Sequence, residues 1–379
     1  MSAERQLRVL LSPSAYYPHV GGIEEVTRQL ALHLAARGHH AEVVTNLWPA
    51  GTAARETLDG VPVTRLPLVL PEHSPRGGGR FAAVAPRSAV RLTRLTGRFD
   101  LLHVIGAGPN AAYAAALRRL LGARIVLTLQ GEFRADAHRA FERSRSLRFG
   151  LRRLLASADA VTACSRFVLD ELSDSGLDVR AGAEVIPNGV NPREFDRAEQ
   201  GGYVLAAGRL VEQKGLDTLL RAYAAARAEL GGRRLVLAGD GPERARLESL
   251  ADSLGLNGDV SFLGSVGRER LAELLGGADL FAFPSRYEAF GVALLEAMAA
   301  GVPAVAARAG GVPEFAVDGE SALLVPPDDA RAFADALVRL ARDDALARRL
   351  AAGGRAQAQR LAWDAIAGRY EDVYRRVLA

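Results

Sequence analysis

Two glutamates eight residues apart lie where a predicted strand gives way to a helix. Glu288 is in the loop after an apolar run that ends near Ser285, and Glu296 is five residues into a helix that starts near Gly291. At 1.5 Å per residue, Glu296 lies roughly 7–8 Å from the helix start. Helix N-termini attract anions, and carboxylates accept strong hydrogen bonds from hydroxyl groups. The pair fits a ligand that combines a phosphate with hydroxyls; a solvated helix glutamate and a plain loop charge are the alternative.

Two cations follow another predicted strand. Arg209 lies at the end of the strand Tyr203–Ala207, after Gly208, and Lys214 precedes a helix that opens near Gly215. Lys214 is the single lysine among 48 basic residues; the other 47 are arginines. The one lysine side chain of the protein therefore lies in this loop. A forked guanidinium and a compact ammonium at a strand-to-helix edge would neutralise a diphosphate and stabilise it as a leaving group. Two surface charges without a ligand are the alternative.

A third candidate loop follows the first predicted strand, Leu7–Leu11. Gly21 and Gly22 open the predicted helix Gly22–Ala36 and let the backbone approach a phosphate closely. The spacing is not the Gly-x-Gly-x-x-Gly of dinucleotide-binding folds, and the chain has no Walker A sequence. A tight turn without a ligand would use the same residues.

The elements that must position these loops alternate between strands and helices. Short apolar runs typical of buried strands lie at Leu7–Leu11, Glu42–Thr45, Leu101–Val104, Arg124–Leu129, Ala160–Ala163 and Glu184–Ile186, and then at Tyr203–Ala207, Arg234–Ala238, Val260–Leu263, Leu280–Phe283, Ala304–Ala306 and Ala322–Val325. Helical patterns between them indicate parallel sheets covered on both faces. The Pro- and Gly-rich stretch Pro187–Gly202 divides the pattern into two cycles. We therefore expect an α/β protein with two Rossmann-like lobes, 1–190 and 200–362, whose sheets face each other across a cleft.

Length and composition agree with that architecture. The chain has 379 residues, of which 49% are hydrophobic and 24% are charged, a balance typical of a folded protein with two domains. Cys164 is the single cysteine, which excludes an intramolecular disulfide and a cysteine-based zinc site. No apolar run approaches 18 residues, and the N-terminus lacks the apolar segment of a secretory signal. We expect a cytoplasmic protein.

Positive charge is concentrated in the first half of the chain. Residues 1–195 carry a net charge of +7, whereas residues 196–379 carry −3. The stretch Arg76–Arg98 has six arginines and no acidic residue, and Arg134–Arg153 has seven arginines against two acidic residues. Apolar side chains are interspersed in both, so these stretches could rest on an anionic membrane at its inner face or guide an acidic acceptor. A solvated basic face is the alternative, and we expect no nucleic-acid partner.

Taken together, the motifs resemble those of the family 4 glycosyltransferases of GT-B fold, which are retaining nucleotide-sugar enzymes. The resemblance covers nearly the whole chain and rests on Gly21-Gly22, Gly208-Arg209…Lys214-Gly215, Gly239-Asp-Gly-Pro-Glu243, Glu288-x7-Glu296 and Gly310-Gly-Val-Pro-Glu314. It implies a hexosyltransferase that moves a sugar from a nucleotide-sugar donor, UDP first and GDP second, to a hydroxyl acceptor. It also implies that 1–190 binds the acceptor, that 200–362 binds the donor, and that a final helix, 363–379, crosses back to the first lobe.

The resemblance implies a role for each candidate residue. Arg209 and Lys214 would grip the donor diphosphate, and Glu288 would bind hydroxyls of the transferred sugar; these three form the expected catalytic set. Glu296 would take the ribose hydroxyls. The remaining donor contacts would be Gly21 and Gly22 on the phosphates, Gln130 on the sugar, Gly264, Ser265 and Val266 beside the base, and the backbone of Phe290, Gly291 and Val292.

One residue departs from the family pattern. The strand Arg124–Leu129 commonly ends in a histidine in this family, whereas here Gln130 follows it, and an amide hydrogen-bonds but does not titrate. His103, at an earlier strand end, is either a site residue or a core histidine. The family implies front-face substitution, in which the leaving diphosphate takes the acceptor's proton. Two cations already stand at the diphosphate and no Asp-x-Asp motif ends a strand, so we expect neither a metal nor another cofactor.

Two other classes share this fold. A non-catalytic nucleotide-sugar-binding protein would be signalled by loss of the motif residues, and Arg209, Lys214, Glu288 and Glu296 are all present. An epimerase would isomerise the donor with no acceptor, and incubation with the donor alone distinguishes it from a transferase.

Overall fold

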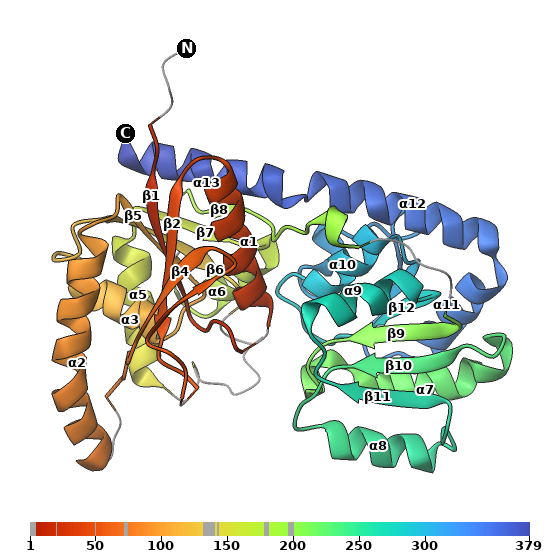
Figure 1. Ribbon diagram of the computed structural model, residues 1–379. Coiled ribbons are helices and arrows are strands. Elements are labelled where there is room, and N and C mark those ends of the chain that lie inside the picture. The colour runs from red at the N-terminus through yellow and green to blue at the C-terminus, as the bar shows by residue number, and fades with distance from the viewer. Residues whose placement is uncertain are drawn as a thin grey trace. The chain divides into compact units, whose positions relative to one another are not determined.

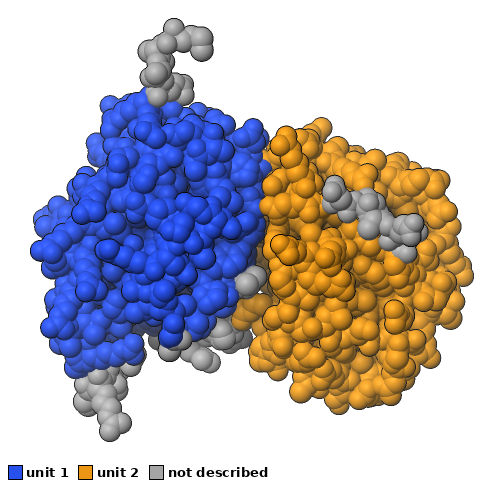
Figure 2. Space-filling model, viewed as in Figure 1, with its two compact units in different colours: residues 1–188, 363–379 blue, residues 189–362 orange. Residues whose placement is uncertain are grey.

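Two β-sheets flanked by helices make up the structure, a computed structural model that describes residues 5–19, 21–49, 51–71, 75–131, 141, 144–177, 182–195 and 201–379 (Figure 1). The chain divides into two compact units (Figure 2). Unit 1 comprises residues 1–188 and 363–379, and unit 2 comprises residues 189–362. Each unit has its own sheet, so the predicted α/β class with two Rossmann-like lobes is confirmed.

The sheet of unit 1 has the strand order β3-β4-β2-β1-β5-β6-β7-β8. Its strands are β1 (Arg8–Pro13), β2 (His40–Asn46), β3 (Arg55–Leu58), β4 (Val61–Leu66), β5 (Leu101–Ile105), β6 (Arg124–Leu129), β7 (Ala160–Ala163) and β8 (Glu184–Val185). All neighbouring pairs are parallel except β3 with β4. The central strands β1 and β5 are buried over nearly their whole length, as expected of a sheet covered on both faces.

The hairpin of β3 and β4 is absent from the predicted strand pattern. Its first strand, Arg55–Leu58, is short, mostly polar and partly exposed at the sheet edge, so it lacks the apolar run that marks the other strands. The turn between the two strands is Asp59-Gly60, and both residues have positive φ, 50° and 80°. An Asp-Gly pair between two strands is a strong hairpin signal, and it was available in the sequence.

The helices of unit 1 cover both faces of its sheet (Figure 1). They are α1 (Gly22–Ala36), α2 (Pro75–Thr96), α3 (Pro109–Leu117), α5 (Arg145–Ser157), α6 (Arg166–Asp174) and α13 (Trp363–Leu378). The crossovers through α1 and α3 run in opposite directions from the sheet centre, and right-handed crossovers therefore place the two helices on opposite faces. On one face α3 packs against α2 and α5, and on the other α1 packs against α13.

A buried polar contact fixes the last helix to this sheet. His103 on β5 is 0% exposed, with Nδ1 2.7 Å from the Tyr374 hydroxyl and Nε2 2.6 Å from the Thr128 hydroxyl. Burial lowers the pKa of His103 to about 3, so the imidazole is neutral, and one ring nitrogen donates while the other accepts. The structure thus confirms that the C-terminal helix returns to the first lobe. It also shows that His103 is a core histidine.

An ion-pair cluster holds the same helix at the surface of unit 1. Glu371 on α13 lies 2.8 Å from Arg37, 3.2 Å from His39 and 2.5 Å from Arg375. Burial by itself would raise the pKa of Glu371, but the hydrogen bonds from these three partners outweigh it and hold the pKa at about 2.

Unit 2 has a parallel sheet with the strand order β11-β10-β9-β12-β13-β14. Its strands are β9 (Tyr203–Ala207), β10 (Arg234–Ala238), β11 (Val260–Gly264), β12 (Leu280–Phe283), β13 (Ala304–Ala307) and β14 (Leu323–Val325). Its helices are α7 (Leu216–Ala226), α8 (Arg244–Ser253), α9 (Arg268–Gly277), α10 (Val292–Ala300), α11 (Ala330–Arg342) and α12 (Asp344–Arg360), with short 3-10 turns η1 (Pro192–Glu194), η2 (Glu212–Lys214), η3 (Arg227–Glu229) and η4 (Val312–Glu314). Leu219, Leu237 and Phe333 belong to one buried core between the sheet and its helices.

Candidate functional site

The strand order of unit 2 marks one edge of its sheet as a ligand position. From β9 the chain proceeds to β10 and β11 on one side, whereas β12, β13 and β14 lie on the other. This reversal between β9 and β12 is a topological switch point, where the carboxyl ends of parallel strands leave a crevice. A small pocket at that position is lined by Arg209 and Lys214 after β9 and by Pro284 and Ser285 after β12.

Lys214 and Glu288 meet directly at this switch point. The Lys214 ammonium forms an ion pair with Oε1 of Glu288, and the Ser285 hydroxyl donates to the same oxygen at 2.9 Å. The Glu288 side chain is 10% exposed and that of Lys214 is 28% exposed. The Lys214 ammonium also lies 5.7 Å from the centre of the Phe283 ring. A partly buried ammonium beside a carboxylate can stabilise negative charge on a ligand while the carboxylate accepts hydroxyl groups.

Arg286 joins the two loops that carry this pair. Its guanidinium lies 2.9 Å from Asp217 and 2.6 Å from Asp328, and it donates to the carbonyl oxygen of Glu212 at 2.6 Å. Its backbone amide donates to the carbonyl of Gln213 at 2.8 Å. The pKa of Arg286 is raised, chiefly by its hydrogen bond to Asp217. Arg286 is not predictable from the sequence, because one arginine among 47 carries no signal by type.

Gly310 and Gly311 pack closely against the loop that carries Glu288. Gly310 has a φ of 55°, and a Cβ there would lie 1.8 Å from the carbonyl oxygen of Glu288. The Gly311 amide donates to that same oxygen at 3.0 Å. Only a residue without a side chain fits beside the carbonyl, so this motif holds the Glu288 loop in place.

Arg209 lines the same pocket and is exposed to solvent. Within the part of the chain that the structure describes, its guanidinium has no hydrogen-bonded or ionic partner. The side chain can therefore turn towards a ligand without breaking an existing contact.

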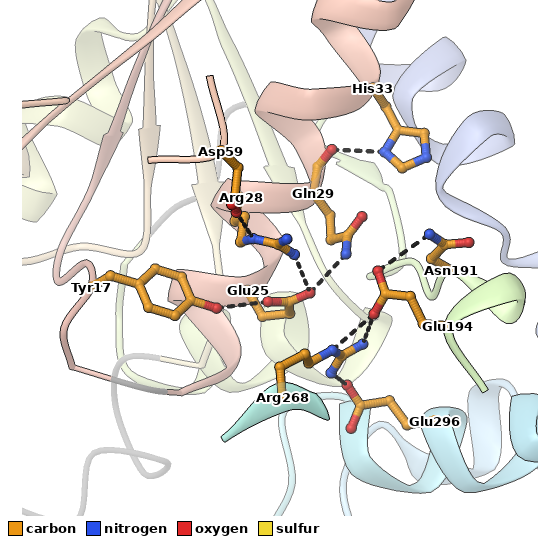
Figure 3. Close-up of polar contacts among 10 residues, drawn as sticks. All are labelled: Tyr17, Glu25, Arg28, Gln29, His33, Asp59, Asn191, Glu194, Arg268 and Glu296. Atoms are coloured by element: carbon orange, nitrogen blue, oxygen red, sulfur yellow. Dashed lines mark hydrogen bonds and ion pairs between the residues drawn. The ribbon is translucent and has the colours of Figure 1, made fainter. Parts of the chain in front are cut away.

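Glu296 lies on α10, which begins after the Phe290-Gly291 turn at the carboxyl end of β12. Gly291 is the N-cap of α10 and Val292 its first residue, while Phe290 is buried and stacks on Phe315 with ring centres 4.7 Å apart. Glu296 is 5% exposed, which excludes a solvated helix glutamate. It forms an ion pair with Arg268, the first residue of α9, which also binds Glu194 (Figure 3).

The predicted base-binding turn stands farther along the sheet. Gly264 ends β11, Ser265 is exposed and Val266 is half-buried, and the turn leads into α9. The Gly239 amide donates to the Gly264 carbonyl at 2.8 Å, which ties this turn to the end of β10. Unit 2 thus brings Arg209, Lys214 and Glu288 together at the switch point. Phe290, Gly291, Val292 and Glu296 lie on the turn and helix that follow β12, and the turn of Gly264 is two strands away.

The unit 1 candidates lie at the carboxyl edge of its own sheet. Gly21 is the N-cap of α1, and the space around the Cα of Gly22 is open. Two carboxylates occupy the first turn of this helix: Glu24 lies 2.6 Å from His19, and Glu25 accepts from the Tyr17 hydroxyl at 2.7 Å (Figure 3 shows the Glu25 contacts). These carboxylates offset the positive end of the helix dipole, a feature absent from the predicted phosphate contacts of Gly21 and Gly22.

Gln130 follows β6 and is fixed by a reciprocal pair of hydrogen bonds. Its amide nitrogen donates to Asn188 at 3.0 Å, and the Asn188 nitrogen donates back at 2.9 Å. The contact sets the orientation of the Gln130 amide. Among the described residues, no group of three or more His, Cys, Asp and Glu side chains could hold a metal ion. No described helix is both long and apolar enough to cross a membrane.

Two protein-family models match successive parts of the chain. A sequence model described as Glycosyltransferase Family 4 matches residues 20–194, and one described as Glycosyl transferases group 1 matches residues 190–357. The first match falls almost wholly in unit 1 and the second in unit 2.

Several curated relatives and solved structures are similar over nearly the full length. The chain is 28% identical to an N-acetyl-alpha-D-glucosaminyl L-malate synthase of Bacillus anthracis, covering 96% of both chains. It is 30% identical to a GDP-mannose-dependent alpha-(1-6)-phosphatidylinositol monomannoside mannosyltransferase of Mycobacterium tuberculosis, covering 97% of this chain and 98% of that one. A sucrose-phosphate synthase structure from Thermosynechococcus elongatus superimposes with a TM-score of 0.81 at 25% identity, covering 98% and 99% of the two chains.

Proposed function

Because the chain belongs to the family 4 glycosyltransferases, retaining enzymes that use nucleotide-sugar donors, we propose that it transfers a hexosyl group from a UDP- or GDP-sugar to a hydroxyl acceptor. The family matches confirm the class of enzyme predicted from the sequence. We place UDP first, and GDP second on the support of the mannosyltransferase relative.

The observation that carries this proposal is the Lys214–Glu288 pair at the switch point of unit 2. In the proposed front-face reaction, the bond from the anomeric carbon to the diphosphate breaks while the acceptor oxygen bonds to the same face. The proton of the acceptor hydroxyl passes to the leaving diphosphate. Arg209 and Lys214 stabilise the charge that develops there, and Glu288 accepts hydroxyls of the transferred sugar.

The other predicted donor contacts complete the proposed site. Glu296 accepts the ribose hydroxyls, and the backbone of Phe290, Gly291 and Val292 binds phosphate or sugar oxygens at the start of α10. We propose that Gly264, Ser265 and Val266 lie beside the base. From the first lobe, Gly21 and Gly22 would contact the phosphates, and Gln130 would hydrogen-bond the sugar.

A screen of nucleotide sugars tests the donor. We expect one UDP- or GDP-sugar to raise the melting temperature more than all others, and product analysis by NMR to show the anomeric configuration of the donor retained. Turnover should continue in EDTA, because two cations replace a metal at the diphosphate. Conversion of the donor with no acceptor present would favour the epimerase alternative, and binding with no turnover would favour a non-catalytic binder.

A basic stripe on unit 1 suggests where this enzyme works. Arg80, Arg87, Arg91, Arg94 and Arg98 are exposed along α2 and the turn after it. The spacing of seven, four and three residues places the first four of these arginines, all on α2, on one helical face, and Arg98 follows in the turn. Within the described part of the chain, none forms an ion pair with a carboxylate. On the other basic stretch, residues 132–140 and 142–143 lie outside the described residues, and α5 presents an exposed Phe149 among arginines.

We propose that this stripe rests on anionic lipid at the cytoplasmic face of a membrane. Each arginine near such a surface contributes up to about 1 kcal/mol, which salt weakens. The mannosyltransferase relative, whose name specifies a phosphatidylinositol-based acceptor, supports a lipid-linked substrate.

Vesicle flotation tests this proposal. We expect binding to vesicles containing anionic lipid at low salt and release at high salt. Reversing Arg87 and Arg91 to Glu should abolish binding, whereas reversing the exposed Arg348 and Arg349 of α12 changes net charge equally and should not. No flotation at low salt would instead favour a soluble small-molecule acceptor.

A further inference from the structure

The Arg268 guanidinium contacts two carboxylates at once. Its Nε and one terminal nitrogen donate to Oε2 of Glu194 at 2.9 and 2.7 Å, and its other terminal nitrogen donates to Oε1 of Glu296 (Figure 3). The Asn191 amide donates to the second oxygen of Glu194 at 3.2 Å. Glu194 belongs to η1, close to the start of unit 2 at Gly189. The Arg268 guanidinium therefore connects Glu296, the proposed ribose-binding residue, to η1, which lies near the start of unit 2.

These contacts set the direction in which Glu296 points. Glu296 is buried on α10, where its neighbours Leu294, Leu295 and Met298 offer no hydrogen bonds from their side chains. A buried carboxylate needs a charged or hydrogen-bonding partner, and Arg268 supplies one.

Arg268 is itself well fixed. Its guanidinium carbon lies 5.0 Å from the centre of the buried Phe195 ring, in addition to the two bonds to Glu194. A planar guanidinium that is hydrogen-bonded to the Glu194 carboxylate and lies over the Phe195 ring can adopt few other orientations. Through Arg268, the Glu296 carboxylate is thus connected to η1 and α9.

Arg268 and a ribose can use Glu296 together. A carboxylate offers about four acceptor positions on its two oxygens. Arg268 donates to Oε1, and in the proposed complex the ribose hydroxyls would donate to other acceptor positions of the same carboxylate. Arg268 could then keep its contact with this carboxylate when a ribose binds.

We propose that Arg268 is a positioning residue that makes the site selective for a ribonucleotide over its 2′-deoxy analogue. The inference rests on the proposed binding of ribose by Glu296. With the carboxylate held in one orientation, loss of the 2′-hydroxyl leaves an acceptor unmatched in a buried site. Without Arg268 the carboxylate can turn away, and the two nucleotides then bind almost equally.

Calorimetric titration of the full chain tests the proposal. The probes are UDP or GDP, whichever raises the melting temperature more, and the 2′-deoxy form of the same diphosphate. For the wild type we expect the ribonucleotide to bind about 5- to 150-fold more tightly, the effect of one unmatched buried acceptor. Arg268→Gln should reduce this ratio to below about 3-fold, and Arg268→Lys, with the charge but not the fork, should give an intermediate ratio.

A neighbouring residue supplies the matched control. Arg270 lies on the same helix and pairs with Glu273 at 2.7 Å on the surface, so Arg270→Gln should keep the wild-type ratio. Glu194→Gln weakens the contact between residue 194 and Arg268 and leaves the Glu296 side chain itself unchanged. This variant should also lower the ratio of ribonucleotide to 2′-deoxynucleotide affinity. This variant provides the measurement if Arg268→Gln fails to fold.

The outcome with Glu296→Gln separates two kinds of failure. If that variant keeps the wild-type ratio, ribose binding by Glu296 is itself wrong. If Glu296→Gln removes the selectivity while Arg268→Gln and Glu194→Gln both keep it, the role of Arg268 is overturned and the proposed function stands. A merely structural role for Arg268 would lower the melting temperature and leave the ratio unchanged.

Discussion

Replacing Lys214 by methionine removes the ammonium from the proposed diphosphate site and keeps most of the side-chain stem. In the structure this ammonium pairs with Glu288 and lies near the face of Phe283. The substitution therefore affects two things: charge stabilisation of the leaving diphosphate, and the partner of a buried carboxylate that keeps its bond to Ser285.

The two effects have different sizes. Loss of one preorganised charge-stabilising group costs about 10²- to 10³-fold in kcat, which corresponds to about 2.7–4 kcal/mol in the barrier. Loss of a hydrogen-bonded partner by a buried group costs about 1–3 kcal/mol of folding free energy. At a temperature well below Tm, the second effect leaves most molecules folded, so the rate reports the first.

Initial rates at saturating donor and acceptor provide the assay. We expect Lys214→Met to lose about 10²- to 10³-fold in kcat. Lys214→Arg should also lose activity because a fork does not reproduce a compact ammonium. The control is Arg221→Met on α7, which removes an exposed cation from the helix that follows Lys214 and should turn over normally. Wild-type turnover in Lys214→Met would refute the assignment of Lys214 to the diphosphate.

Three other predictions concern stability and packing. Burial lowers the pKa of His103 from 6.5 to about 3, so between pH 6.5 and about pH 3 the unfolded chain binds this proton and the folded chain does not. The free energy of unfolding should therefore fall as pH drops through that range, less steeply in His103→Gln, and denaturant titrations with equal slopes would contradict this. Glu371 has its pKa lowered from 4.5 to about 2, so its stabilising contribution is complete above pH 4.5 and lost towards pH 2. We expect Glu371→Gln to cost about 1–3 kcal/mol at pH 7, measured by denaturant unfolding, and an unchanged midpoint would disprove it. A Cβ on Gly310 would meet the Glu288 carbonyl at 1.8 Å, whereas Gly319 has a similar positive φ and open space around it. Gly310→Ala should therefore lower both kcat and Tm more than Gly319→Ala does. Equal losses in the two variants would mean that the positive φ alone explains them, and would contradict a role for the contact with Glu288.

The positions of most strands, and of the loops that end them, follow from the sequence. Parallel strands buried on both faces must be short apolar runs, and charged residues directly after such runs must lie at the carboxyl edge of a sheet. This local rule placed Arg209, Lys214 and Glu288 correctly in their loops, and the structure confirms the two-lobe class. The hairpin of β3 and β4 was missed because an exposed edge strand is not required to be apolar.

Tertiary structure decided which of these residues touch. Lys214 pairs with Glu288 across 74 residues of sequence, and His103 binds Tyr374 across 271. Arg268 reaches both Glu194 and Glu296, and nothing in the sequence distinguishes this arginine from the other 46. Periodicity reports which face of an element is buried, but the partner of a buried charge depends on the order of strands in the sheet. That order arises from packing among distant segments, so these contacts became visible only in the folded chain.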